Sequence, residues 1–243
     1  MEKELLPSSH RPDPLPSSPW LITQTWEHIL FMHWELPASS LQALIPSELE
    51  LDMFDGSAWL SILPFRVVHQ RIRGLPEIPL FRTYLELNVR TYVKHNGYNG
   101  VYFFLLDANH PLAVLGAKAL SLPYRYATME MQQSLDKVNY KSKRIFESGQ
   151  QGEFTASYKP TSPASATTPG SLDHWLLERY CLFTKWGNQI LRGDIHHQKW
   201  EVSQAEAEVA INTAAPFSIP NKKPLLHYAP LKKAFIGSLK KMG

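Results

Sequence analysis

One stretch with strict alternation limits what this chain can fold into. Residues 81–94 read FRTYLELNVRTYVK, in which every second residue is apolar or threonine. A period of two predicts a β-strand with one apolar face and one face rich in functional groups. The second face carries polar, charged and aromatic side chains, namely Arg82, Tyr84, Glu86, Asn88, Arg90, Tyr92 and Lys94.

This second face has two interpretations. The simpler one is a solvated outer face. The other is a polar row that points into the lumen of a closed sheet, where it would contact a ligand. The pattern supports a kind of site and does not name a reaction.

Length, composition and charge narrow the class of protein. All-β barrels often reach 243 residues as a single domain, and 44% hydrophobic residues are enough for a sizeable core. A net charge of +3 is too small to indicate nucleic acid or a membrane surface as a partner. No apolar run is long enough to span a bilayer. We therefore expect no nucleic-acid partner and no membrane partner.

The N-terminus and the cysteine count indicate a compartment. Residues 1–19 are rich in Pro and Ser, and we predict a flexible arm there, followed by one domain over residues 20–243. The arm lacks the apolar core of a secretory signal. Cys181 is the only cysteine, which rules out an intrachain disulfide. We expect a cytoplasmic protein and leave open whether it forms a homo-oligomer.

The remaining pattern predicts a β-rich α+β fold with few helices. The turn pairs Asp55-Gly56 and Asn96-Gly97 each predict a hairpin, and Pro64 indicates an edge or a bend. Residues 201–214 fit either a helix or a strand. The expected helices are 39–45, 111–120 and 172–180, the last capped by Ser171. The expected strands are 21–36, 49–54, 58–68, 81–94, 101–107, 126–131, 140–146, 152–158, 181–186, 189–197, 225–229 and 233–239.

Familiar cofactor and nucleophile motifs are absent from the sequence. It contains no glycine-rich nucleotide loop, no paired-cysteine metal motif and no nucleophile elbow. His28 and His33 are five residues apart on one strand, so they point to opposite faces and do not predict a metal site. We expect no cofactor and no metal.

Several segments, taken in order, resemble a known family. They are TYLELNVRTYV, GVYFFLLDA, AVLGAKALSLPY, LDHWLLERYCLFT, IHHQKW and LLHYA. Together, over residues 20–239, they resemble the uncharacterised YqjF-like family. That family in turn looks like a branch of the acetoacetate decarboxylase-like superfamily. The resemblance implies a single-domain, cone-shaped β-barrel of antiparallel and mixed strands with a few flanking helices.

The resemblance also bears on chemistry. Acetoacetate decarboxylases carry two lysines after a proline, one of which forms a Schiff base, whereas here Tyr124 and Arg125 follow Pro123. Neither a phenol nor a guanidinium can form a Schiff base, and Lys118 lies earlier, on the expected helix. Glu86 stands where those enzymes have a lumen glutamate, which favours the lumen interpretation of the row.

Three hypotheses for function remain. In the first, the chain is a barrel that binds a small carboxylate or keto acid without Schiff-base chemistry, and Arg90 and Arg125 clamp the anion. In the second, it is an enzyme of acid–base type, with Glu86 as general base and Tyr124 or Arg125 as electrophile. In the third, it is an interaction protein with a filled barrel. The predicted ligand-binding residues are Tyr84, Glu86, Asn88, Arg90, Tyr124 and Arg125.

One property separates the first two hypotheses. A binding role leaves Glu86 paired with Arg90, whereas an acid–base role requires Glu86 to be desolvated.

Overall fold

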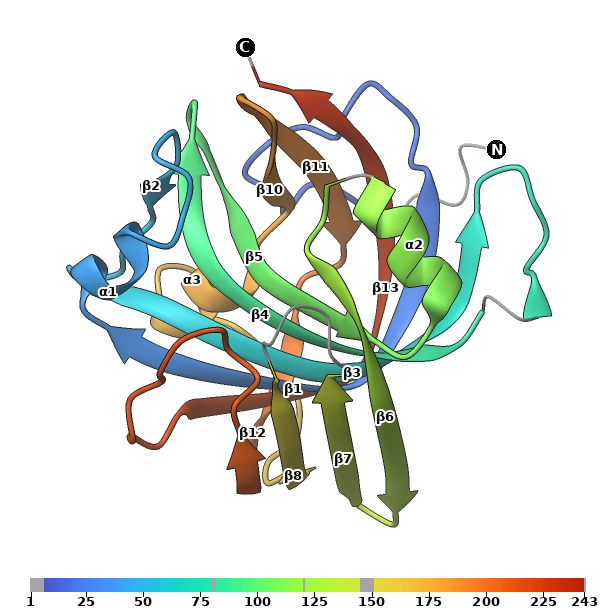
Figure 1. Cartoon of the computed structure of the whole chain (residues 1–243), viewed down its shortest axis with the longest axis vertical. Coiled ribbons are helices and arrows are strands. Elements are labelled where there is room, and N and C mark those ends of the chain that lie inside the picture. Colours follow the sequence, from blue (N-terminus) through green and yellow to red (C-terminus); the bar gives the residue numbers. More distant parts are fainter. Residues whose placement is uncertain (1–6, 80–81, 120, 145–150, 243) are drawn as a thin grey trace.

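Seven strands close into a ring in the part of the chain that the structure describes (Figure 1). The structure is a computed structural model that describes residues 7–79, 82–119, 121–144 and 151–242. Neighbouring ring strands pair antiparallel, except that β5 and β10 pair parallel. In order around the ring, these strands are β4 (Tyr84–His95), β3 (Ala58–Ile72), β1 (Ile22–Leu36), β13 (Leu225–Lys241), β11 (Gln189–His197), β10 (Cys181–Trp186) and β5 (Tyr98–Ala108).

A second group of strands extends from the ring, at the bottom of Figure 1. It begins where β6 pairs parallel with β5, and it returns where β12 pairs with β13. Two short strands pair with members of either group, β2 with β4 and β9 with β12. The strands outside the ring are β2 (Glu50–Leu51), β6 (Tyr124–Ser134), β7 (Lys137–Arg144), β8 (Glu153–Pro160), β9 (Ser165–Ala166) and β12 (Glu201–Asn212).

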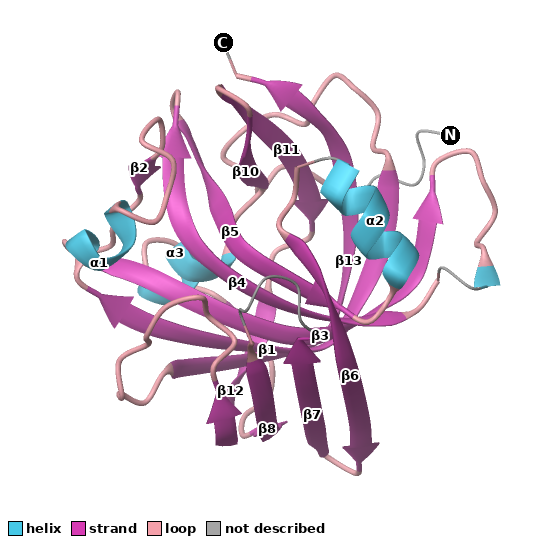
Figure 2. Ribbon diagram, in the orientation of Figure 1, coloured by secondary structure: helices cyan, strands magenta, loops and turns pink. Residues whose placement is uncertain are grey.

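Three short helices complete the described structure (Figure 2): α1 (Ala38–Gln42), α2 (Pro111–Ala119) and α3 (Leu172–Leu177). Each overlaps a segment where the sequence predicts a helix. Ser171 caps α3 as expected, because its Oγ accepts the backbone N–H of His174 at 3.2 Å. The mostly β architecture with few helices confirms the predicted class, with a ring of strands at its centre.

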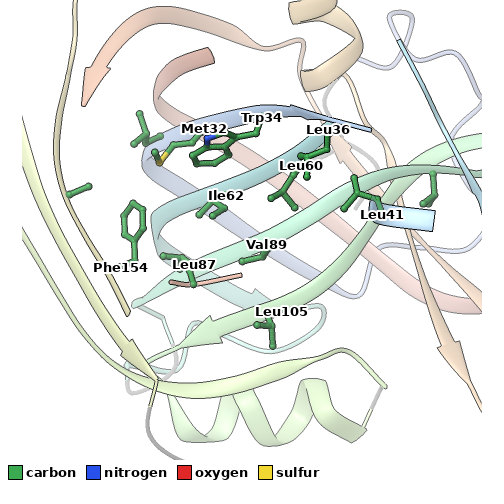
Figure 3. Close-up of a cluster of buried hydrophobic side chains, with 14 of the residues drawn as sticks. Met32, Trp34, Leu36, Leu41, Leu60, Ile62, Leu87, Val89, Leu105 and Phe154 are labelled. Atoms are coloured by element: carbon green, nitrogen blue, oxygen red, sulfur yellow. The ribbon is translucent and has the colours of Figure 1, made fainter. Parts of the chain in front are cut away.

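The two faces of β4 contact different cores. Leu87 and Val89 point to the outer side of the ring, where they pack with Ile62 of β3 and Met32 of β1 (Figure 3). Side chains of β7 and β8, among them Phe154, close this core from the other side. From Leu85 to Val93, the apolar face of the sequence pattern is therefore covered by protein.

The opposite face of β4 points into the ring. Tyr84 and Tyr92 belong to a second apolar cluster, which receives side chains from every strand of the ring and from α3. Leu176 of α3 is fully buried in this cluster. A flanking helix would pack against the outer face of the sheet. α3 instead packs against the face of β4 that carries the polar row.

One expected hairpin is paired differently. Asp55 and Gly56 form a turn with positive φ angles of 48° and 80°, as Asp-Gly predicts. The strand before the turn, however, pairs with β4 through Leu51 and Val93 instead of with β3. Across the turn, only an isolated bridge joins Phe54 to Ser57.

Pro64 lies in the middle of the sheet, not at an edge. It belongs to β3, which pairs with β4 on one side and β1 on the other. The β1–β3 register shifts between Glu27 and Met32, and His28 has a φ of 53°. Pro64 lies opposite this bulge, where no ladder pairing with β1 requires its missing N–H.

The structure also describes the C-terminal segments and part of the N-terminal arm. The ambiguous segment forms strand β12, and the two short C-terminal strands are one continuous strand, β13. Within the predicted arm, Arg11 is buried and its Nη1 donates to the Ile195 carbonyl at 2.8 Å. Phe81, Leu120 and residues 145–146 of the expected elements lie outside the described residues.

In the part of the chain that the structure describes, no helix has both the length and the apolar character that crossing a bilayer requires.

Candidate functional site

The polar row of β4 is buried inside the ring. Only 4% of Glu86 and 8% of Asn88 are exposed, and Arg90 is half-buried. Such burial excludes the solvated-face interpretation. The role of the row stays a prediction, and the geometry around each member decides which chemistry it can support.

Glu86 is a buried carboxyl without a cationic partner among the described residues. The Tyr124 hydroxyl donates to Glu86 Oε2 at 3.1 Å, and the Asn88 side chain also hydrogen-bonds Glu86. Burial raises the pKa of Glu86 to about 7, although the bonds from Tyr124 and Asn88 oppose that rise. The arrangement matches desolvation of Glu86 and not pairing with Arg90.

A network of amides holds Tyr84 beside Glu86. Gln24 Nε2 donates to Gln70 Oε1 at 2.6 Å and to the Tyr84 hydroxyl at 3.0 Å. The Tyr84 hydroxyl in turn donates to Gln70 Oε1 at 3.0 Å. Burial, and then the nearby Glu86, raise the pKa of Tyr84 well above its usual value. Tyr84 therefore stays protonated and positions this end of the row.

Arg125 lies on the other face of the sheet from Tyr124. Its Cα partner in β5 is Asp107, which faces outward with Leu87. Burial raises the pKa of Asp107, and the charges of Arg144 and then Arg125 oppose that rise. Adjacent residues of a strand point to opposite faces, so Tyr124 and Arg125 cannot both enter the ring. The expectation that Arg125 joins the site is therefore corrected.

A second polar group lies at the Arg90 end of the row. His33 pairs in register with Ser61, and Ser61 with Arg90, so the three side chains form a line across β1, β3 and β4. The Tyr92 hydroxyl lies 2.6 Å from Ser61 Oγ, which lies 2.6 Å from His33 Nδ1. Arg179, which follows α3, stacks over the Tyr92 ring at 5.0 Å.

Sequence reasoning missed His33, Ser61 and Arg179 as site residues. The alternation in β1 put His33 on the opposite face from Gln24, but the bulge at His28 brings both into the ring. Ser61 follows the period of β3, but serine is common on strands, and nothing local links it to residue 33 or 179. The remaining signal in the sequence was a polar side chain at a strand position that faces into the ring.

Metal and thiol chemistry find no support in the described residues. No group of three or more His, Cys, Asp or Glu side chains is arranged there to hold a metal ion. Cys181 is buried, and burial raises its thiol pKa to about 12, which disfavours the thiolate that nucleophilic attack needs.

With this geometry in view, comparison with known proteins identifies the family. A family model for uncharacterized conserved proteins, DUF2071, matches residues 23–232. The chain belongs to the DUF2071 family. It is 45% identical to the uncharacterized protein YqjF of Bacillus subtilis (strain 168), over 93% of this chain and 95% of that protein.

Solved structures share the fold. An acetoacetate decarboxylase-like enzyme from Sphingomonas wittichii RW1 matches with a TM-score of 0.63 and 13% identity, over 97% of this chain and 98% of that one. The enduracididine biosynthesis enzyme MppR, complexed with pyruvate, matches with a TM-score of 0.63 and 7% identity, over 94% and 92%. The DUF2071 chain thus has an acetoacetate decarboxylase-like fold, as the resemblance predicted.

Proposed function

We propose that the ring interior binds a small oxo acid and that Glu86 moves a proton at the carbon beside its carbonyl group, without a Schiff base. The observation that carries this proposal is that Glu86 is buried without a cationic partner among the described residues, and that burial raises its pKa to about 7. A catalytic acid or base works best when its pKa lies near the working pH.

The chemistry balances with groups that the ring contains. Ionised Glu86 takes a proton from the carbon next to the carbonyl, and the C–H electron pair moves onto the carbonyl oxygen to give an enolate. Protonated Glu86 then returns a proton to carbon. The hydroxyl of Tyr124, 3.1 Å from Glu86 Oε2, stabilises the ionised form that begins each cycle.

The residues after Pro123 support chemistry without a Schiff base. Tyr124 and Arg125 follow Pro123, so no lysine amine is available at that point. Lys232 is the one buried lysine among the described residues, and its Nζ donates to the Lys199 carbonyl at 2.6 Å and lies 4.9 Å from the Trp200 ring centre. Burial lowers the pKa of this amine, so Lys232 is the lysine that a borohydride test must examine first.

Binding without chemistry is the second candidate function. The observation that favours it is Arg90, a half-buried cation with no acidic partner among the described residues. Either candidate needs an anionic ligand in the ring, so the two differ only in what happens at Glu86.

Proton exchange at carbon tests the proposal. Pyruvate, acetoacetate and levulinate place the carboxylate at increasing distance from the carbonyl, and pyruvate is the ligand named for the MppR structure. In D₂O we expect the protein to accelerate exchange of the protons beside the carbonyl for at least one of them, as followed by proton NMR. Glu86→Gln should abolish the acceleration, and Tyr124→Phe should reduce it.

Two results decide between the candidates. Binding of an oxo acid that survives in Glu86→Gln, with no exchange even in the wild type, would establish a binding protein instead of an enzyme. A borohydride-trapped adduct between a lysine and any of the three oxo acids, located by peptide mass analysis, would contradict chemistry without a Schiff base.

A further inference from the structure

Four side chains at the Arg90 end of the ring have buried nitrogen atoms without a hydrogen-bond partner among the described residues. They are His33 Nε2, Arg90 Nε, Arg179 Nη2 and His227 Nδ1. Buried polar groups in proteins are nearly always hydrogen-bonded, because an unmet donor loses the full energy of its hydration. Four unmet nitrogens within one interior indicate that something else binds there.

The four side chains lie close to one another. The rings of His33 and His227 meet edge to face with centroids 5.6 Å apart. The guanidinium groups of Arg90 and Arg179 lie 5.8 Å and 5.0 Å from the centre of the same Tyr92 ring. Arg90 is also close enough to His33 and to Arg179 for its charge to act on both.

The hydrogen-bond chain from Tyr92 sets which nitrogen of His33 carries the proton. If Tyr92 donates to Ser61 and Ser61 donates to His33 Nδ1, every hydroxyl proton in the chain has an acceptor. In the reverse direction the Tyr92 proton has no acceptor among the described residues. Burial and the neighbouring His227 and Arg90 lower the pKa of His33 well below its usual value, so the ring is neutral. His33 Nε2 then carries the proton and is a free donor.

Charge at this end is compensated for three of the four side chains. Arg179 Nη1 pairs with Asp52 Oδ2 at 2.5 Å. His33 is neutral, and burial also lowers the pKa of His227, whose Nε2 lies 3.2 Å from Asp173 Oδ1. Of the four side chains, Arg90 is therefore the cation without an acidic partner among the described residues.

We infer that Arg90, His33 and Arg179 form a subsite for a single carboxylate. A carboxylate carries one negative charge, which neutralises Arg90, and its two oxygens can accept from the free N–H groups of His33 and the guanidinium groups. A phosphate dianion would leave an excess negative charge in a largely buried site, beside the carboxylates of Asp52 and Asp173.

The surroundings supply a neighbouring cavity and a direction for the ligand. A cavity of about 220 Å³ is lined by Arg179 of the subsite and by Trp175, over whose ring the Arg179 guanidinium stacks at 4.3 Å. Along β4, Arg90 is four residues from Glu86, roughly 13 Å between Cα atoms on a straight strand. Asn88 lies between them, and its Oδ1 has no partner among the described residues. A ligand would extend from Arg90 towards Glu86, past an acceptor that suits a hydroxyl group.

This inference rests on the proposed function, because it places the carboxylate of the proposed substrate. Its test measures binding alone, so a failure of acid–base chemistry at Glu86 would not affect it.

The experiment is calorimetric titration of the full chain at low ionic strength with pyruvate, acetoacetate, levulinate and inorganic phosphate. We expect at least one oxo acid to bind at least about ten times more tightly than phosphate. Arg90→Gln should weaken that binding by about 10- to 100-fold, the range for one charge-assisted hydrogen bond. Arg71→Gln, which removes a cation near Trp20, is the matched control and should leave binding unchanged.

A second readout does not depend on any variant folding. In ¹⁵N spectra of the wild type, His33 should be neutral with its proton on Nε2, and that signal should shift on addition of the same oxo acid. Tighter binding of phosphate, equal binding by wild type and Arg90→Gln, or a His33 signal that no oxo acid moves would each overturn the carboxylate subsite.

Discussion

Two arginines on opposite sides of the ring wall show the difference between a structural charge and a charge kept for a ligand. Arg144 Nε and Nη2 donate to the two carboxylate oxygens of Asp107 at 2.8 and 2.9 Å, and Nη2 also donates to the Ala214 carbonyl at 2.9 Å. Gly152 leaves room for this guanidinium, since a Cβ there would lie 2.5 Å from Arg144 Nη1. Arg90, inside the ring, has no acidic partner among the described residues.

The contrast separates two kinds of contribution. On the outer side, Asp107 and Arg144 neutralise and hydrogen-bond each other within the apolar packing, so changes there should act on stability. On the inner side, Glu86 is desolvated and Arg90 has no counter-charge among the described residues. Both features lower the free energy of unfolding. Changes there should act on binding and chemistry and have smaller or opposite effects on stability.

The largest effect is expected when the satisfied pair is broken. Asp107→Asn leaves the Arg144 guanidinium buried without its counter-charge, and we expect a loss of about 3–5 kcal/mol in the free energy of unfolding. Urea unfolding followed by circular dichroism measures it. A loss below about 1 kcal/mol would mean that the two arginines do not differ in the way described.

A smaller effect, with the opposite sign, is expected at Glu86. Its pKa is about 7 in the fold, against a usual value of 4.5. Between these values the unfolded chain has lost the proton that the folded chain keeps, so the stability of the wild type falls as pH rises from about 4.5 to 7. The full change is on the order of 3 kcal/mol, from a shift of roughly two to three pKa units.

Glu86→Gln removes that dependence. Unfolding curves at pH 5 and pH 8 should show the variant gaining stability relative to the wild type at the higher pH. Glu130→Gln, at an exposed position of β6, is the control and should follow the wild type at both values. Parallel behaviour of Glu86→Gln and wild type would argue against a desolvated carboxyl.

The local pattern was enough to predict much of the sheet. Asn96 and Gly97 have φ angles of 49° and 81°, and they join β4 and β5 in the hairpin that the sequence predicts. What the pattern could not reveal is the bulge at His28, because one extra residue exchanges the two faces of everything after it. The pairing of β2 with β4 also depends on contacts distant in sequence.

The candidate site divides in the same way. Glu86, Asn88 and Arg90 share one strand, so alternation alone groups them, and the resemblance to a known family added Tyr124. Arg125 was placed in the ring because adjacent residues were carried over together, although a strand sends neighbours to opposite faces. Arg179 reaches the ring from the segment that follows α3, so no periodicity in the sequence links it to β4.

The smallest effect is expected for Arg90→Gln. Removing this side chain leaves no buried acid without its partner, so we expect the free energy of unfolding to change by less than about 1 kcal/mol. The same urea experiment measures it beside Asp107→Asn. A loss comparable to that of Asp107→Asn would show that Arg90 has a structural partner, and would remove the distinction between the two arginines.

The most direct test of the account is a ¹³C NMR titration of the Glu86 carboxyl carbon in the folded protein. A midpoint near pH 7 is predicted, because burial without a cation raises the pKa of this group. In Tyr124→Phe, which lacks the hydroxyl that donates to the carboxylate, the midpoint should rise further. A midpoint near the usual 4.5 would contradict the claim that the ring holds Glu86 ready to exchange a proton.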